Sequence, residues 1–180
     1  MQFVDAIKYK KEVEELYVSA FPKDERAPIK LLYKRLKRKE NKFYAIEENG
    51  EFIGLVYLIT KGDIAYIFFF AIVEEKRGQG YGTRTLSLIK EMYKNYRICL
   101  MIEDTNIVDS FNYNERIKRL HFYVKNGFKQ LNVKVNEAGV DYELLSTGSS
   151  VTQKEFLSLM RSYVNWLLYK ILYRKTKIEK

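Results

Sequence analysis

A short glycine-rich segment, Arg77-Gly-Gln-Gly-Tyr-Gly82, is the part of the sequence best suited to bind an anion. It follows a nearly all-apolar run, Ile64–Val73, which predicts a buried strand, and it precedes an amphipathic helical pattern that begins near Thr83. Glycines let the backbone approach an anion without interference from Cβ atoms, and the N–H groups at a helix start face the same way. The segment therefore predicts a pyrophosphate-binding loop, to which Arg77 adds charge; an ordinary tight turn is the plainer alternative.

Two other nucleotide-binding motifs also place glycines after a strand. The dinucleotide motif Gly-x-Gly-x-x-Gly has an acidic residue about 20 residues further on, and Glu103 falls near that place. However, its third glycine would be residue 83, which is a threonine, and hairpins rather than βαβ units are predicted before the loop. The P-loop motif needs Gly-Lys-Ser/Thr, which the sequence lacks. Neither motif is favoured.

The loop and a second motif together resemble the GCN5-related N-acetyltransferases (the GNAT superfamily). The family's acetyl-coenzyme A signature, Gln/Arg-x-x-Gly-x-Gly/Ala, is matched by Arg77–Gly82, and its helix motif Phe-Tyr-x-x-x-Gly-Phe is matched by Phe122–Phe128. The predicted order of strands and helices agrees with the family from Met1 to about Ser146. The sequence departs from the family at two positions. The family often has an Asn seven residues before the Tyr, where this sequence has Arg116, and an Ala three residues after that Asn, where it has Arg119.

The resemblance implies that an amine attacks the thioester of bound acetyl-coenzyme A directly. It further implies that Tyr123 acts as an acid toward the departing thiolate, for which a core aromatic residue is the plainer interpretation. Backbone N–H groups at Ile72 or Val73 are the simplest donors for the developing oxyanion. The cofactor-binding residues implied in this way are Ala71, Ile72, Val73, Arg77, Gly78, Gln79, Gly80, Tyr81, Gly82 and Thr83, with Asn112 or Asn114 in the role of the family's Asn.

The incoming amine must also lose a proton, which calls for a general base. Glu103, at the end of the predicted strand Arg97–Glu103, is the leading candidate, and Asp104 and Glu74 are alternatives. A solvated acid at a strand end is the plainer interpretation of Glu103. The single histidine, His121, is not expected to take part, and no cluster with metal-ligand spacing predicts a metal site.

The elements that must position these residues predict an α/β (α+β) fold. The order is β-α-α-β-β-β-α-β-α-β-β-α, a mixed, mostly antiparallel sheet with one parallel strand–loop–helix–strand unit for the cofactor. Asn49-Gly50 predicts a tight hairpin turn, and Gly127 a helix C-cap. We expect residues 1–148 to form the acetyltransferase domain and residues 149–180 to add an amphipathic helix and a basic tail, packed on or extending that domain.

The predicted C-terminal helix begins at Thr152, whose spacing to Glu155 is that of a capping box. A single continuous helix would bury one stripe and leave other large apolar side chains exposed. This predicts self-association through the helix; docking on an anionic membrane is less favoured, and enclosure by its own domain is the plainer alternative. The stripe consists of Phe156, Met160, Tyr163, Leu167 and Ile171.

Composition and charge limit the remaining function classes. The chain has 180 residues and a net charge of +9. Its hydrophobic content of 47% excludes a disordered protein, and its two prolines and nine glycines exclude a collagen-like one. Much of the positive charge lies in Lys30–Lys42 and Tyr169–Lys180. Only Tyr33 is aromatic in the first of these segments, so nucleic-acid binding is not favoured over a solvated surface.

The sequence contains one cysteine, Cys99, which lies in an apolar run, so we expect a buried, inert thiol. Together with the lack of an apolar leader, this leads us to expect a cytoplasmic protein. The acceptor is expected to be an amine of a small molecule or peptide, with residues 21–26 and 104–112 as candidate walls of its pocket. A non-catalytic acyl-coenzyme A sensor and a basic nucleic-acid-binding module are the alternatives to an enzyme.

Overall fold

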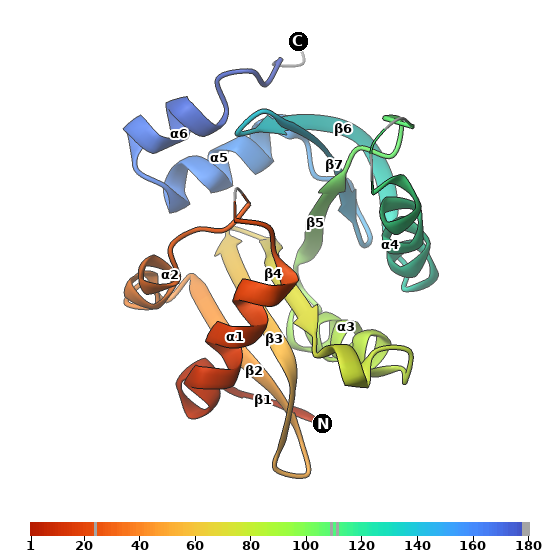
Figure 1. Cartoon of the computed structure of the whole chain (residues 1–180). Coiled ribbons are helices and arrows are strands. Elements are labelled where there is room, and N and C mark those ends of the chain that lie inside the picture. The colour runs from red at the N-terminus through yellow and green to blue at the C-terminus, as the bar shows by residue number, and fades with distance from the viewer. Residues whose placement is uncertain (24, 109, 111, 178–180) are drawn as a thin grey trace. The chain divides into compact units, whose positions relative to one another are not determined.

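The computed structural model describes residues 1–23, 25–108, 110 and 112–177 (Figure 1). Among these residues, seven strands are hydrogen-bonded in the order β1-β2-β3-β4-β5-β7-β6. Every pairing with a recorded register is antiparallel except that of β4 with β5, which is parallel, so the predicted mixed α/β fold is confirmed. The chain divides into two compact units, one made of Met1–Thr60 and Ile67–Lys94, the other of Lys61–Tyr66 and Asn95–Lys180.

The first unit carries the amino-terminal strands and helices. A tight turn at Asn49 and Gly50, with φ of 53° and 81°, joins β2 to β3 and confirms the predicted hairpin. The elements are β1 (Gln2–Asp5), η1 (Ala6–Tyr9), α1 (Lys10–Ala20), α2 (Ile29–Arg35), β2 (Asn41–Glu48), β3 (Glu51–Lys61), β4 (Ile64–Ile72, which begins in the second unit), η2 (Glu74–Lys76) and α3 (Tyr81–Met92).

Strand β4 is the buried strand that the apolar run predicts, and its side chains alternate between two packed faces. Phe69 makes edge contacts with Tyr17 and Phe21, at ring-centroid distances of 5.0 Å to each. Phe70 instead packs, as Tyr81 does, against the buried cluster of Ile46, Ile53 and Ile72. Because successive side chains of a strand point to opposite faces, α1 and the start of α3 cover opposite faces of β4.

The second unit is built around β5. The elements are β5 (Arg97–Glu103), α4 (Tyr113–Lys125), β6 (Lys129–Glu137), β7 (Val140–Ser146), α5 (Gln153–Tyr163) and α6 (Trp166–Leu172). The parallel pairing of β4 with β5 runs from Ile64–Arg97 to Tyr66–Cys99. Cys99 is fully buried, and burial raises the pKa of its thiol far above the usual range, as expected for an inert cysteine.

The C-terminal region differs from the single helix that the sequence predicts. The capping box is confirmed, because Thr152 Oγ1 accepts from the Glu155 N–H and the Glu155 carboxylate accepts from the Thr152 N–H. The helix stops at Val164, however, and a second helix begins after Asn165, whose side chain accepts from the Leu168 N–H. The predicted continuous stripe is therefore wrong: Phe156, Met160 and Tyr163 are buried, whereas Leu167 and Ile171 are exposed.

Candidate functional site

The glycine loop of the first unit has the backbone geometry of an anion cradle. Gly78 and Gly80 have φ of 73° and 82°, and a Cβ atom built on either would have no atom within 4 Å. Gly80 is the N-cap of α3, and no side chain among the described residues caps this helix. The first N–H groups of α3 therefore have no capping partner, which is the arrangement that binds phosphate groups.

The loop is held in place by bonds to its own backbone. Arg77 Nε donates to the Ile72 carbonyl at 3.1 Å, and Gln79 Nε2 donates to the Glu75 carbonyl at 2.7 Å. The Val73 N–H donates to the Ile53 carbonyl at 3.0 Å. Of the two N–H groups predicted as oxyanion donors, that of Val73 is thus engaged, and that of Ile72 remains the candidate.

A glycine that sequence reasoning missed supports the strand end before the loop. A Cβ atom on Gly54 of β3 would lie 2.3 Å from the Ala71 carbonyl oxygen and 3.1 Å from the Ile72 Cα. Gly54 pairs with Ile46, next to a register shift between Ile46 and Glu47. A glycine inside a strand pattern signals such a close approach, so it was the available clue.

The second predicted motif, Phe122–Phe128, is a helix end that fixes the position of Tyr123. The Phe128 N–H donates to the Tyr123 carbonyl at 3.1 Å, and the Gly127 N–H donates to the Val124 carbonyl at 2.9 Å. With Gly127 at φ 81°, this is a Schellman motif, completed by packing of the Phe128 ring on the Tyr123 ring at 5.6 Å. The predicted C-cap is confirmed. Burial raises the pKa of Tyr123 to about 12, so its hydroxyl keeps its proton at neutral pH.

Glu103 lies in a charged cluster that the sequence did not predict. One carboxylate oxygen, Oε1, accepts from Arg116 at 2.8 Å and from Asn112 Nδ2 at 3.0 Å, and the other accepts from Arg119 at 2.9 Å. Glu103 is 5% exposed and Arg116 8%. The two arginines that depart from the family pattern are thus the partners of Glu103, and their spacing of three residues on one helix face was the signal for it.

The two asparagines predicted as alternatives differ in their surroundings. The Asn112 side chain is engaged with the cluster, because its Oδ1 also accepts from Arg116 Nε at 2.7 Å. Asn114 is exposed, and its side chain forms no hydrogen bond with the described residues. Of the two, Asn114 has the side chain that is open to a ligand.

The other two candidate bases also differ from each other. Asp104 Oδ1 accepts from Lys134 Nζ and from the Asn106 N–H, both at 2.9 Å. Burial raises the pKa of Asp104, but these hydrogen bonds outweigh it and the net shift is downward. Glu74 is exposed and forms no ion pair with any described residue. His121 is exposed on α4, outside the charged cluster.

The sequence model described as "Acetyltransferase (GNAT) family" matches residues 10–128, which is more than half of the chain. The chain belongs to this family. The matched range contains the glycine loop, the charged cluster and the Schellman motif, so the resemblance inferred from the two motifs is confirmed. The chain is accordingly an acetyltransferase.

Solved structures of GNAT acetyltransferases share the fold. A protein from Bacteroides thetaiotaomicron, described as a GNAT-family acetyltransferase, is 22% identical with a TM-score of 0.75, and the match covers 96% of this chain and 97% of that one. An Elizabethkingia anophelis acetyltransferase with acetyl-CoA bound is 21% identical with a TM-score of 0.53, covering 68% and 84%. The ribosomal-protein-S18-alanine N-acetyltransferase of Escherichia coli is 14% identical with a TM-score of 0.61, covering 85% and 95%. No curated protein sequence matches the chain closely.

Some predicted features of this GNAT acetyltransferase fall outside the described residues. They are Asp24, Asp109 and Phe111 of the candidate acceptor walls and residues 178–180 of the basic tail. Among the residues that the structure covers, no group of His, Cys, Asp and Glu side chains could hold a metal ion. Within the same part of the chain, no helix is long and apolar enough to span a membrane.

Proposed function

We propose that this acetyltransferase moves an acetyl group from acetyl-coenzyme A to a primary amine. The observation that carries the proposal is the uncapped start of α3 behind two left-handed glycines, a backbone cradle for a pyrophosphate group. The acetyl-CoA-bound structure of the Elizabethkingia relative supports the choice of ligand. When bound, acetyl-coenzyme A would supply the activated acetyl thioester.

The N–H groups from about Gly78 to Thr83 would hold the pyrophosphate, and Arg77 would add positive charge beside it. Asn114 would be the asparagine that contacts the ligand, because Asn112 is engaged with Glu103 and Arg116. The strand end Ala71–Val73, kept in place by the close approach to Gly54, would orient the acetyl group.

Tyr123 would assist the departing thiolate as a hydrogen-bond donor. Its pKa of about 12 keeps the proton on the hydroxyl, yet it makes complete transfer to a thiolate with a pKa of about 8.5 unfavourable. The help is therefore that of a hydrogen bond and should be modest, at the low end of the roughly 10²–10⁴-fold range of general acid–base catalysis or below it.

We further propose that Glu103 holds Arg116 and Arg119 in position, since three donors already occupy its carboxylate. Glu74 is then the candidate base that keeps a free carboxylate. Glu103→Gln and Glu74→Gln distinguish these roles. Loss of the true base lowers kcat/KM most below neutral pH, where the amine is more fully protonated, whereas loss of a positioning residue lowers it evenly across pH.

The acceptor would be an amine of a small molecule or peptide. The net charge of +9 disfavours a polycationic acceptor, because like charges slow the encounter. Self-association through the C-terminal helices remains a prediction from the sequence.

The test is turnover of acetyl-coenzyme A by the purified full chain with a panel of neutral, acidic and polycationic amines. Acetyl-coenzyme A at about 100 times its Kd should stabilise the fold by roughly 2.7 kcal/mol. Binding without turnover on any amine would favour a non-catalytic sensor. Protection against heat by NADH and not by acetyl-coenzyme A would refute the proposal.

A further inference from the structure

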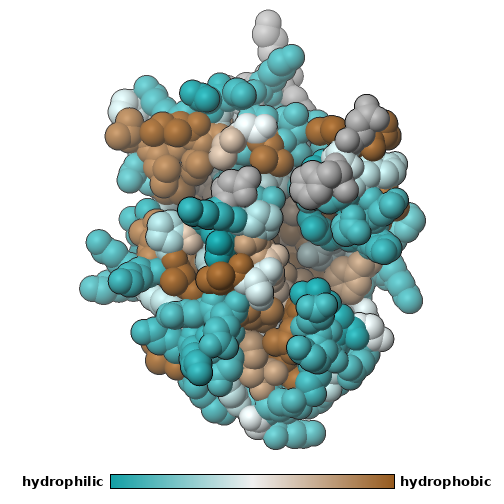
Figure 2. Space-filling model, in the orientation of Figure 1, coloured by the Kyte–Doolittle hydropathy of each residue, from teal (hydrophilic) through white to brown (hydrophobic). Residues whose placement is uncertain are grey.

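The two-turn helix α6 exposes an apolar face. Trp166, Leu167 and Ile171 are 57%, 63% and 56% exposed. Tyr173, just after the helix, is buried. In Figure 2, hydrophobic side chains gather at the upper left, where Figure 1 places α6.

The helix is held in place by the hairpin of its own unit and does not depend on a partner for its conformation. The Ala138 N–H donates to the Leu172 carbonyl at 2.8 Å. Thr176 Oγ1 donates to the Asn136 carbonyl at 2.8 Å, and Gln153 Nε2 donates to the Lys177 carbonyl at 2.8 Å. The exposed apolar face is therefore a fixed feature of a folded segment.

The same region carries only positive charge. Residues 156–177 contain five basic residues and no acidic residue. All five are exposed, and none forms an ion pair with a described residue. They are Arg161, Lys170, Arg174, Lys175 and Lys177.

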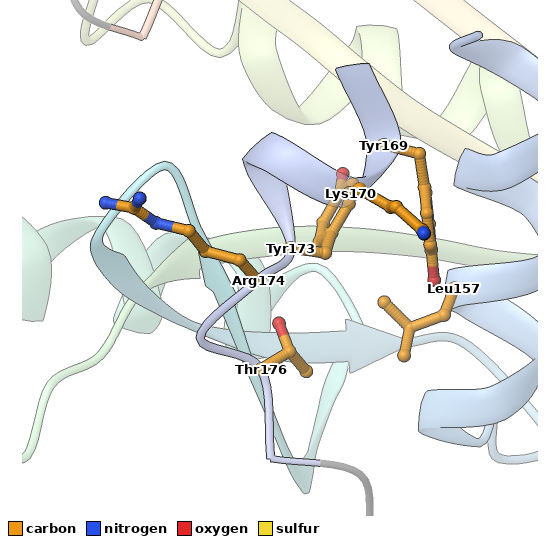
Figure 3. Close-up of a pocket in the computed structure, with 6 residues that line it drawn as sticks. All are labelled: Leu157, Tyr169, Lys170, Tyr173, Arg174 and Thr176. Atoms are coloured by element: carbon orange, nitrogen blue, oxygen red, sulfur yellow. The ribbon is translucent and has the colours of Figure 1, made fainter. Parts of the chain in front are cut away.

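Lys170 connects the charge to the apolar face. Its ammonium lies 4.0 Å from the centroid of the Trp166 ring. It also lines, with Tyr169 and Leu157, an open pocket of about 180 Å³. In Figure 3, the Lys170 and Tyr169 side chains extend to the same side, toward Leu157, whereas the Arg174 guanidinium points away from them.

This charge distribution decides between the two partners that an exposed apolar face can have. In a two-fold dimer the same face meets itself, so two clusters of unpaired basic residues would be brought together. An anionic lipid surface offers the complementary charge, and Trp and Leu side chains beside Lys and Arg are typical of helices that lie in the membrane interface.

We propose that α6 docks this protein on an anionic phospholipid membrane. Trp166, Leu167 and Ile171 enter the interface between headgroups and acyl chains, and Lys170 and Arg174 contact lipid phosphates. This docking is independent of the acetyl transfer proposed above, because it uses no residue of the loop or of the charged cluster.

The experiment uses the fluorescence of Trp166, which is the only tryptophan in the chain. Vesicles of phosphatidylcholine mixed with phosphatidylglycerol should shift the Trp166 emission to shorter wavelength, and the full chain should co-sediment with them. Vesicles of pure phosphatidylcholine should have neither effect. Leu167→Asn/Ile171→Asn and Lys170→Glu/Arg174→Glu should each weaken vesicle binding by at least about tenfold. All four side chains are exposed, so the fold should be retained.

The matched control is Lys37→Glu/Lys39→Glu, which makes the same charge change at two exposed residues of the other basic segment. It should lower binding far less than Lys170→Glu/Arg174→Glu. An equal loss would show general electrostatic attraction and overturn the proposal, as would unchanged Trp166 emission with mixed vesicles. A full-length dimer that Leu167→Asn/Ile171→Asn converts to a monomer in sedimentation would assign the face to a second copy instead.

Discussion

The glycine loop and the charged cluster around Glu103 differ in where their charge partners come from. The loop is suited to bind the charge of a ligand, whereas the cluster pairs charges of the chain itself. The loop presents backbone N–H groups, a Cβ atom added at Gly78 or Gly80 would have no atom within 4 Å, and the charged side chain of Arg77 is exposed. The cluster is made of side chains, with Glu103 and Arg116 almost fully buried and each already bound to the other. A change in the loop should therefore affect a ligand and spare the fold, whereas a change in the cluster should affect the fold first.

The largest effect is expected from Glu103→Ala, which leaves Arg116 buried without its counter-ion. Removal of one partner of a buried pair should lower the free energy of unfolding by about 3–5 kcal/mol, measured by urea denaturation. Arg119 adds little to this because its side chain is 43% exposed. Arg116→Met in the Glu103→Ala background should recover part of the loss. A change below about 1 kcal/mol would show that the cluster is as dispensable to the fold as the loop.

Gly80→Asp should weaken acetyl-coenzyme A binding by at least about a hundredfold, because a carboxylate would enter the anion cradle. Its control is Gly80→Asn, which has the same shape and the same tolerance of a positive φ without the charge. A Cβ atom at Gly80 meets nothing, but the φ of 82° strains any side chain, so both variants should lose a similar amount of the free energy of unfolding, about 1–2 kcal/mol. Calorimetric titration measures the binding. Equal affinities of the two variants would remove the electrostatic argument for the loop.

Gly54→Ala tests the support beneath the loop. The added Cβ would lie 2.3 Å from the Ala71 carbonyl oxygen, so the strands must shift, at a cost of about 1–3 kcal/mol in the free energy of unfolding. Gly62→Asn is the control, since a Cβ atom there meets nothing and Asn tolerates its φ of 58°. If Gly54→Ala also weakens acetyl-coenzyme A binding, ligand binding by the loop depends on the packing of Ala71, and the contrast between the loop and the packed cluster is smaller than stated above.

The smallest effect is expected from Tyr123→Phe, which should lower kcat by about tenfold and leave the Kd of acetyl-coenzyme A unchanged. The same variant should also change how the free energy of unfolding depends on pH at high pH. The raised pKa means that the folded chain holds this proton more tightly, so the stabilisation is complete below pH 10 and is lost as the pH rises toward 12. Tyr123→Phe should lose less stability over this range in urea denaturation. An equally steep loss of stability in Tyr123→Phe would show that a group other than Tyr123 causes this pH dependence.

The two regions also differ in how far the sequence could predict them. The loop, the Asn49-Gly50 turn and the Gly127 cap could be predicted because a positive φ restricts the residue type at the position itself. The cluster could not, since which residues meet Glu103 depends on how α4 packs on β5. The residues involved are nine to sixteen positions away in the chain.

The break between α5 and α6 was missed for a related reason. No proline or glycine marks it, and apolar residues continue through Val164 at helical spacing. The one local signal was Asn165, a residue type that favours the N-cap position. In a continuous helix, Leu167 and Ile171 would have had to be buried as Phe156 and Met160 are.

The helix end at Phe122–Phe128 determines which changes in chain length the end of α4 can tolerate. The three residues between Tyr123 and Gly127 serve as a spacer, so their number matters more than their chemical character. One inserted residue would turn the Tyr123 side chain by about 100° around the α4 axis relative to the glycine. Insertions should therefore be accepted at the exposed Asn49-Gly50 turn and rejected within this spacer, whatever residue is inserted.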